Sequence, residues 1–294
     1  MLRSITILTL LCAALLTACT DHRIAPGAPA ARQRVKTIVL DKGDGITNVT
    51  SFSYDATGRL AGLIAYQTPD STQAAVDYTT YQYDAQNRLA FVRRETRLFP
   101  RGSQPNRIEQ YTYTYNQAGQ ATSLAYANGY TLAFRYDGAG QLTGAGRSFS
   151  TGGLIISGGD SYTFMGGNLT SYSTSVSVAG HGGPAGPPSG VSSTLTYDTK
   201  TNPFFGRFII PAPYPSGFIN LTFGPGAVVT YFGGVDNALT LSQNNVLTET
   251  LSNGQSVSYA YQYDGSGLPT RRVKTTPSTS GTTTETLLFT YETY

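Results

Sequence analysis

The sequence has few of the residues on which metal sites, disulfide frameworks and most catalytic centres depend. Its 294 residues include two histidines, two cysteines and no tryptophan, and only 13% of them are charged. A structural zinc site needs about four nitrogen or sulfur ligands, and both cysteines, Cys12 and Cys19, lie together near the N-terminus. We therefore expect no metal, no cofactor and no fold based on disulfide bonds.

The charge balance excludes a further class of function. The formal net charge is +3, which is too small for a protein that binds nucleic acid by neutralising phosphates, and too small for disorder driven by charge repulsion. Glycine and tyrosine are abundant instead, with 33 and 21 residues. A chain rich in Tyr, Thr, Ser and Gly and poor in charge is typical of an all-β protein outside the cytoplasm.

The N-terminal segment is typical of a secretory leader. Arg3 precedes the apolar run ITILTLLCAALL at 5–16, which is shorter than the about 20 residues needed to span a bilayer and matches the core of a signal peptide. The run ends in LTAC at 16–19, which resembles the lipobox of bacterial lipoproteins. The resemblance implies cleavage before Cys19 and lipidation of Cys19, which anchors the chain to a membrane. The alternative is an ordinary signal peptide with an incidental cysteine.

These features divide the chain into three parts. Residues 1–18 form the lipoprotein signal peptide. Residues 19–34 contain Pro, Gly and Ala without an apolar period, so they predict a flexible tether. Residues 35–294 are expected to form a single β domain, in which the glycine- and proline-rich stretch 179–190 is a flexible loop.

One short pattern recurs along this domain: an aromatic residue, any residue, a second aromatic residue, Asp, two variable residues, Gly, a polar residue and Leu. The clearest copies are FSYDATGRL at 52–60, YQYDAQNRL at 81–89 and FRYDGAGQL at 134–142, and others lie at 113–119, 162–169, 195–203 and 261–269. Residues i and i+2 of a strand share a face, so the two aromatic side chains of a copy point the same way. Each copy therefore predicts a β-hairpin.

The Asp and Gly positions of the pattern predict the turn of each hairpin. An Asp side chain accepts a backbone N–H two residues further on, and Gly, or in its place Asn, adopts the positive φ that a tight turn needs. In the copy at 195–203 the Asn comes one position late. The predicted turn residues are Asp55, Gly58, Asp84, Asn87, Asn116, Gly119, Asp137, Gly140, Asp198, Asn202, Asp264 and Gly267.

Repetition of this unit predicts an all-β fold. Successive hairpins form an antiparallel meander that makes a curled sheet or an open barrel, with little or no helix. At five or six residues per strand, the domain holds roughly fourteen to eighteen strands. The Tyr and Phe ladder is expected to pack in the core, and the alternative is a stacking platform for sugar rings.

The units YDATGRL at 54–60 and YDAQNRL at 83–89 resemble the YD repeats of RHS-type proteins. With the lipobox, NPFFG at 202–206, Asn244-Asn245 and YQYDGSGLP at 261–269, they resemble a family of Bacteroidetes envelope lipoproteins that carry YD-like repeats. The resemblance covers nearly all of 35–294 and implies a curled antiparallel sheet held by lipid in the cell envelope, at the outer membrane. The family has no assigned activity. Large RHS proteins encase a toxin, and this chain is far shorter than they are.

Two classes of function follow from these observations. The first is a lipid-anchored envelope protein that acts as a non-catalytic binding or structural module, with a glycan or a protein as its partner, on the periplasmic or the external face. The alternative is an enzyme that acts on polysaccharide. The repeated Asp residues could pair as the acid and base of a glycosidase, but turn capping accounts for them. We therefore predict that the protein is not an enzyme.

One segment gathers arginines in a chain that is otherwise poor in charge. The planar guanidinium group of Arg donates two parallel hydrogen bonds to a carboxylate or phosphate, so the segment is a candidate site for an acidic polysaccharide or a lipid headgroup. The alternative is a solvated strand and loop. The candidate polyanion-binding residues are Arg93, Arg94, Arg97, Arg101 and Arg107.

Overall fold

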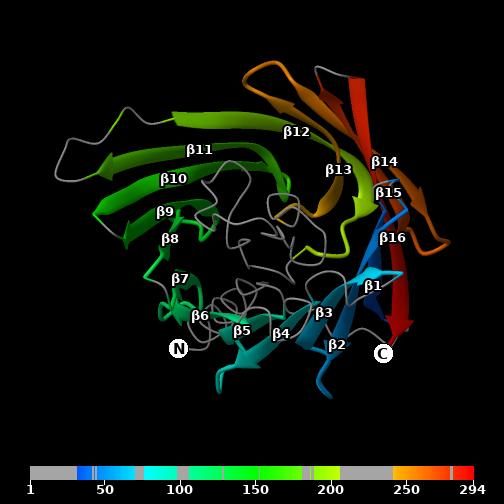
Figure 1. Ribbon diagram of the computed structural model, residues 1–294, viewed down its shortest axis with the longest axis horizontal. Coiled ribbons are helices and arrows are strands. Elements are labelled where there is room, and N and C mark those ends of the chain that lie inside the picture. Colours follow the sequence, from blue (N-terminus) through cyan, green and yellow to red (C-terminus); the bar gives the residue numbers. More distant parts are fainter. Residues whose placement is uncertain are drawn as a thin grey trace, which may run out of the picture. The chain divides into compact units, whose positions relative to one another are not determined.

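The computed structural model describes residues 32–41, 43, 45–69, 76–97, 106–127, 129–151, 153–180, 186, 189–205, 241–278 and 281–294. Within these residues the chain forms sixteen β-strands and no helix. Each strand is antiparallel to its neighbours in sequence, and β1 pairs with β16, so the strands close into a barrel (Figure 1). No helix in the described ranges is long and apolar enough to cross a membrane.

The strands follow one another as hairpins around the wall of the barrel. Their bounds are β1 (Gln33–Asp41), β2 (Thr47–Tyr54), β3 (Leu60–Thr68), β4 (Val76–Tyr83), β5 (Leu89–Arg97), β6 (Arg107–Tyr115), β7 (Ala121–Tyr126), β8 (Thr131–Tyr136), β9 (Leu142–Thr151), β10 (Leu154–Met165), β11 (Asn168–Gly180), β12 (Ser189–Thr201), β13 (Asn244–Leu251), β14 (Ser256–Tyr263), β15 (Pro269–Ser278) and β16 (Gly281–Thr293).

The all-β antiparallel meander predicted from the repeat is confirmed, and the barrel is closed rather than open. β1 begins at Gln33, where it pairs with the end of β16, so the folded domain starts before residue 35. β11 extends to Gly180 and β12 begins at Ser189. Both ends of the predicted flexible loop 179–190 are therefore strand residues, because pairing between hairpin partners continues into the glycine-rich stretch.

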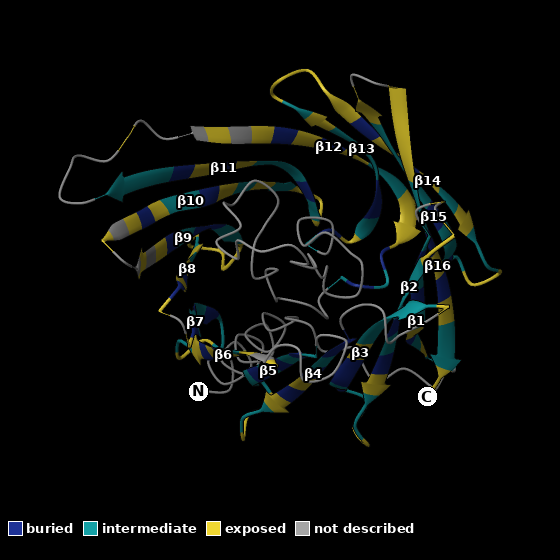
Figure 2. Cartoon of the chain, in the orientation of Figure 1, coloured by how far each residue is buried: buried dark blue, intermediate teal, exposed yellow. Residues whose placement is uncertain are grey.

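Side chains alternate between the two faces of the wall, as the two-residue period of a strand requires. On β6, Tyr111 and Tyr113 are buried, whereas Gln110, Thr112 and Thr114 are exposed. Figure 2 shows the same alternation as bands of burial along other strands. The buried side chains form one core cluster that includes residues from β1 to β16, and the lumen is the face that all these strands share. The buried face is therefore the inner one.

The outer face carries mainly hydroxyl groups, most regularly on β9 to β14. Exposed residues there include Ser148, Ser157, Ser173, Ser175, Thr194, Thr196, Thr250, Ser256 and Ser258. Among the described residues, large apolar side chains exposed on the strands are scattered singly, at Ile64, Ile108, Ile155, Met165 and Leu288. A wall that is apolar inside and polar outside is what an aqueous exterior and a packed interior require.

In most copies of the repeat, a tyrosine hydroxyl joins the copy to the hairpin before it. The second tyrosine of the pattern donates its O–H to a carbonyl at the start of the preceding return strand. Tyr83 donates to the Leu60 carbonyl at 2.9 Å and Tyr115 to the Leu89 carbonyl at 2.6 Å. The same bond joins Tyr54 to Val35, Tyr136 to Ala121, Tyr197 to Leu169 and Tyr291 to Pro269. The aromatic position of the repeat is therefore a hydrogen-bond donor as well as a core residue.

Close approach of neighbouring backbones explains why β9 and β10 contain glycine. A Cβ atom at Gly158 would lie 2.1 Å from the Ser175 carbonyl oxygen, and one at Gly144 would lie 2.2 Å from the Asp160 carbonyl oxygen. Gly146 differs, because its nearest neighbour would be the Ala133 carbonyl oxygen at 3.9 Å. Only the first two glycines are required by the packing of the strands.

We predict that Gly158→Ala destabilises the barrel by roughly 1–3 kcal/mol, because the added methyl group forces two paired strands apart. Gly146→Ala is the matched control: it lies on a paired strand with room for Cβ, and loss of unfolded-state entropy should leave stability unchanged or slightly higher. Denaturant unfolding of both variants measures the difference. Equal losses for the two would contradict the packing described here.

Candidate functional site on the inner wall

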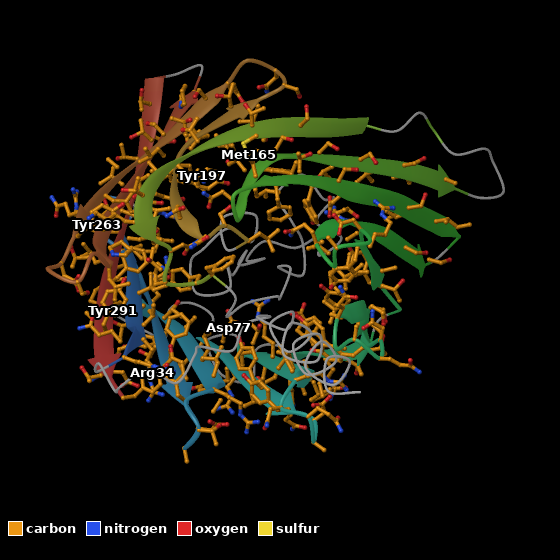
Figure 3. All side chains as sticks on the ribbon, turned by 180° about the vertical axis from the view of Figure 1, so that it is seen from behind. Arg34, Asp77, Met165, Tyr197, Tyr263 and Tyr291 are labelled. Carbon is orange, nitrogen blue, oxygen red and sulfur yellow. The ribbon has the colours of Figure 1, made fainter. Side chains whose placement is uncertain are left out.

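A buried ionic cluster lies on the inner face of β4, β5 and β6. Asp77 lies on the inner side of the wall (Figure 3), is 2% exposed, and is opposite Thr96 in the register of β4 and β5. Arg94 Nη2 lies 3.2 Å from Asp77 Oδ2, and its Nη1 lies 3.2 Å from Glu109 Oε2 on β6. Thr96 Oγ1 also donates to Asp77. One guanidinium group therefore bridges two carboxylates inside the barrel.

The electrostatics of this cluster hold the arginine in its charged form. Burial alone would lower the pKa of Arg94, but the nearby carboxylates of Asp77 and Glu109 raise it above its usual value. Burial, followed by the charge of Glu109, raises the pKa of Tyr111. The Tyr111 hydroxyl thus stays protonated and donates to Glu109 Oε2 at 2.7 Å.

A second cluster of the same kind lies on β9, β10 and β11. The Arg147 guanidinium group forms an ion pair with Asp160, which is 4% exposed. Thr174 Oγ1 donates to Asp160 Oδ1 at 2.7 Å, and the Tyr162 hydroxyl donates to Oδ2 at 3.2 Å. Asp160 and Thr174 are paired in the register of β10 and β11, so the strands themselves bring these groups together.

A third polar group surrounds Glu249 on β13. Its carboxylate accepts hydrogen bonds from the hydroxyl groups of Tyr172 on β11 and Tyr259 on β14. The Arg272 guanidinium group on β15 lies 5.4 Å from the centroid of the Tyr259 ring. The inner wall therefore carries separate clusters of polar side chains, with apolar and aromatic side chains between them.

These contacts limit the chemistry that the inner wall can do. A glycosidase needs one carboxyl group that is protonated near neutral pH and a second one that is ionised. Asp77, Glu109 and Asp160 are each engaged in an ion pair with an arginine inside the barrel. No group of three or more His, Cys, Asp or Glu side chains that could hold a metal ion occurs among the described residues. The clusters are therefore suited to tying strands together across the lumen face.

Sequence reasoning missed these inner acidic residues, although a signal for them was present. Asp77 has the same strand phase as Tyr81, and Asp160 has the same strand phase as Tyr162. Polar residues in phase with a buried aromatic ladder point into the core and need a partner there. Asking where that partner lies would have found Arg94 and Arg147.

The predicted polyanion-binding arginines do not form one surface. Arg94 is buried inside the barrel, whereas Arg93 and Arg97 lie on the outer face and both bond Glu95, at 2.9 and 2.8 Å. The reason is the alternation of side chains along β5. Arg97 also stacks on the Tyr78 ring at 4.4 Å. Arg107 begins β6 and its side chain is not described, and Arg101 lies outside the described residues.

Most of the predicted turn residues lie in turns with one common geometry. Asp55 Oδ1 accepts the backbone N–H groups of Thr57 and Arg59, at 2.9 and 3.0 Å, and Gly58 has a φ of 82°. Asp84, Asp137 and Asp264 accept the matching N–H groups, and Asn116 accepts the one four residues on. The positive φ angles are 62° at Asn87, 81° at Gly119, 84° at Gly140 and 83° at Gly267.

An arginine connects neighbouring turns where the repeat ends in Arg-Leu. Arg59 Nε donates to Asp55 Oδ2 at 2.7 Å, and Arg59 Nη1 donates to Asn87 Oδ1 in the next turn at 2.6 Å. The Arg59 guanidinium group stacks on the Tyr83 ring, with 4.4 Å to the centroid. Arg88 repeats the stacking on the Tyr115 ring at 4.4 Å. The Asp, Arg and Tyr of the pattern thus act as one unit across adjacent hairpins.

The copy at 195–203 departs from this geometry in part. Asp198 Oδ1 accepts the Lys200 backbone N–H two residues on at 2.9 Å, as predicted, but Asp198 lies within β12 and the chain turns at Asn202, which does not adopt a positive φ. β-Branched Thr199 and Thr201 favour an extended backbone, and no glycine follows at the expected position. The Asp198 carboxylate also accepts the Asn245 backbone N–H at 3.1 Å and the Tyr263 hydroxyl.

Comparisons with known proteins address the repeat and the fold. The family model described as RHS Repeat matches residues 115–148. The resemblance to RHS repeats is confirmed for this stretch. No curated protein matches the sequence.

Solved structures extend the comparison to the whole wall. The chain is similar to the crystal structure of a porin-like protein from Bacteroides uniformis, with 15% sequence identity, a TM-score of 0.51, and coverage of 88% of this chain and 98% of that one. A porin-like protein from Bacteroides vulgatus matches with 14% identity, a TM-score of 0.38, and coverage of 89% and 99%. The first of these shows a shared fold.

We predict that Arg94→Met lowers the free energy of unfolding by about 3–5 kcal/mol, because it leaves Asp77 and Glu109 inside the barrel without their cation. Arg93→Met is the matched control on the same strand. It removes one outer ion pair, and such pairs contribute little to stability. Urea unfolding of the two variants tests the assignment, and a similar loss for both would place Arg94 on the wrong face.

From the lowered pKa values of the turn aspartates, we predict that the protein loses stability in acid. Burial opposes ionisation of Asp55, but hydrogen bonds from Thr57 and Arg59 hold its pKa well below the usual 3.8. The pKa of Asp84 is lowered too: burial opposes ionisation, but hydrogen bonds from Arg88 outweigh it. The pKa of Asp264 is lowered chiefly by a hydrogen bond from the Ser266 hydroxyl. Since the folded pKa is below the unfolded one, this stabilisation is present above about pH 4 and is lost as the pH falls further.

Melting temperatures between about pH 2 and pH 7 measure this effect. The triple variant with Asp55→Asn, Asp84→Asn and Asp264→Asn should be less stable than the wild type at pH 7 and should lose less stability in acid. Asn116 occupies the equivalent position of another copy, so the substitution is compatible with the turn. Parallel pH profiles for the two proteins would show that these aspartates do not carry the acid sensitivity.

Proposed function

We propose that the protein is a lipid-anchored, non-catalytic barrel of the cell envelope that stands in the aqueous phase beside the membrane. The observation that carries this proposal is the polarity of the wall. A barrel that spans a bilayer has an apolar outer band with aromatic girdles and a polar interior. Here Ile38, Leu124, Leu132 and Leu287 face inward at 1% exposure or less, and the exposed residues of β9 to β14 are mainly serine and threonine.

The likeness to a porin-like protein supports this proposal only through the fold. An outer face of hydroxyl groups would have to be dehydrated in a bilayer, at a cost for every side chain without a partner. Attachment to the membrane then falls to the N-terminal segment, where the lipobox-like LTAC at 16–19 supplies Cys19 for acylation. Cys19 itself lies outside the described residues.

The contacts of the inner wall favour a structural or binding role over catalysis. Asp77, Glu109, Asp160 and Glu249 on the inner wall are each held by arginine or tyrosine side chains, an arrangement that suits ties between strands. A polysaccharide-acting enzyme, the alternative from the sequence, gains no supporting group from these residues. Binding of an acidic glycan or lipid headgroup through Arg93 and Arg97 stays a prediction, and such a ligand would compete with Glu95 for both guanidinium groups.

Membrane fractionation tests the anchor and the aqueous location together. We expect the wild-type chain in the membrane fraction, released only by detergent. A variant with Cys19→Ser behind an ordinary cleavable leader should be released without detergent as a folded protein, because its outer wall has no apolar band. Mass spectrometry of the wild-type N-terminus should show acyl chains on Cys19.

Two results would overturn the proposal in different ways. A wild-type chain without acyl groups at Cys19 would remove the lipid anchor. A Cys19→Ser variant that still requires detergent for extraction would show that the barrel itself enters the bilayer.

A further inference from the structure

Arg272 is a buried cation that lacks the kind of partner its counterparts have. It lies on the inner face of β15, is 4% exposed, and is opposite Tyr261 in the register of β14 and β15. Arg94 and Arg147 on the same face are each paired with a carboxylate. No ion pair of the described residues includes Arg272, and its Nε donor is buried without a hydrogen-bond acceptor.

The neighbours of Arg272 compensate its charge only in part. Its guanidinium carbon lies 5.4 Å from the centroid of the Tyr259 ring, and its side chain bonds the Tyr261 hydroxyl. Glu249 accepts from tyrosine hydroxyls and Asp198 from Asn245 and Tyr263. Glu285 on the adjacent strand β16 lies two residues from Leu287, the register partner of Arg272, and no ion pair of the described residues joins it to Arg272. A buried charge in such surroundings is costly unless a counter-charge reaches it.

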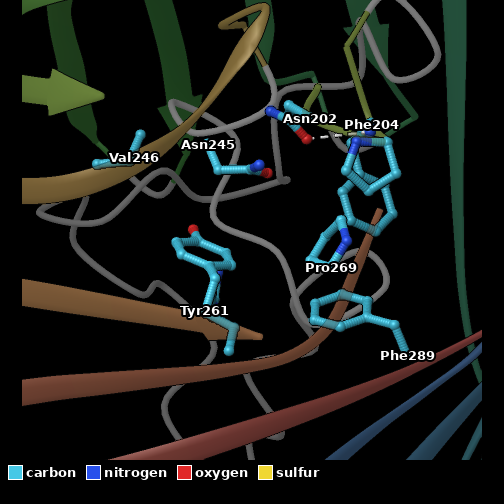
Figure 4. A pocket seen from close by; sticks show the side chains of 9 residues that line it. Asn202, Phe204, Asn245, Val246, Tyr261, Pro269 and Phe289 are labelled. Atoms are coloured by element: carbon cyan, nitrogen blue, oxygen red, sulfur yellow. Dashed lines mark hydrogen bonds between the residues drawn. The ribbon is translucent and has the colours of Figure 1, made fainter. Parts of the chain in front are cut away.

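A small cavity lies beside this cation (Figure 4). It is lined by residues that include Asn202, Phe204, Asn245, Tyr261, Arg272 and Phe289, and its volume is about 20 Å³. A space of this size is enough for one water molecule or one monatomic ion. Ring edges carry partial positive charge, and the rings of Phe204 and Phe289 lie 6.2 Å apart.

We propose that this cavity is a binding site for a halide ion, chloride in the cell, with Arg272 as its cation. The orphaned Nε–H donates to the anion, and the ion supplies the negative charge that Arg94 and Arg147 receive from carboxylates. The site connects β15 to the turn at Asn202 and to the start of β13. Bound halide therefore stabilises the wall where the repeat geometry is interrupted.

Thermal unfolding of the wild-type full chain in sodium chloride and in sodium gluconate, at equal ionic strength, tests the proposal. Ligand binding stabilises the folded state by mass action, so chloride at about a hundred times its Kd should raise Tm by roughly 5 °C. The rise should saturate with chloride concentration, whereas a general salt effect does not. Arg272→Met should abolish the difference between the two salts.

Arg271→Met is the matched control, because Arg271 is the adjacent residue and its side chain has the opposite strand phase. That variant should keep the full chloride effect. Anomalous scattering from bromide in crystals of the wild-type protein gives a readout that does not depend on the stability of any variant, and a peak beside Arg272 Nε is expected. Equal Tm values in both salts, or a cavity without bromide, would overturn the proposal and assign the space to water.

Discussion

The hydrogen bond from a repeat tyrosine to the carbonyl of the preceding hairpin is the contact on which the wall depends. Tyr54, Tyr83, Tyr115, Tyr136, Tyr197 and Tyr291 all make it. Strand pairing alone fixes each hairpin to its neighbour at the edge, but leaves the angle between them adjustable. The hydroxyl bond spans the strand ends at these six positions, whereas Tyr263 donates to Asp198, and it holds each of the six pairs of hairpins at a fixed inclination. Curvature accumulated in this way brings β16 back to β1.

The inward position of the same tyrosines explains why the interior combines apolar and polar groups. Each ring occupies core volume, and its hydroxyl needs an acceptor there. Backbone carbonyls accept the hydroxyl hydrogen bonds at the strand ends. Elsewhere carboxylates accept them: Glu109 from Tyr111, and Glu249 from Tyr172 and Tyr259. Arg94 in turn pairs with Glu109, so the ionic cluster on β4 to β6 is coupled to the tyrosine-rich core. These contacts tie neighbouring strands together.

Local features of the fold could be predicted from the sequence, because local residues determine them. Gly58 and Asn87 identify the turns through the backbone conformation that they allow. Closure could not be predicted, because the contact of Arg34 with Glu292 joins residues 258 positions apart and leaves no trace in either neighbourhood. The position of Arg93 and Arg94 on opposite faces of the wall follows from the two-residue period of a strand, but only once the bounds of β5 are known. The residue Asn202 could be predicted as a turn residue, but its contact with the Ser242 carbonyl could not, because Ser242 comes from a distant segment.

The pairing of the first strand with the last has a consequence for how the chain acquires its fold. Most neighbouring strands follow one another closely in sequence, except β12 and β13, which residues 202–243 separate, so those hairpins form as soon as both strands are present. The outer edge of β1 must wait for β16, and until then it presents an open row of backbone donors and acceptors. While the chain folds, this edge of the growing sheet therefore stays unprotected until the last strand is in place. Premature pairing of β1 between two chains is the characteristic misfolding hazard of this architecture.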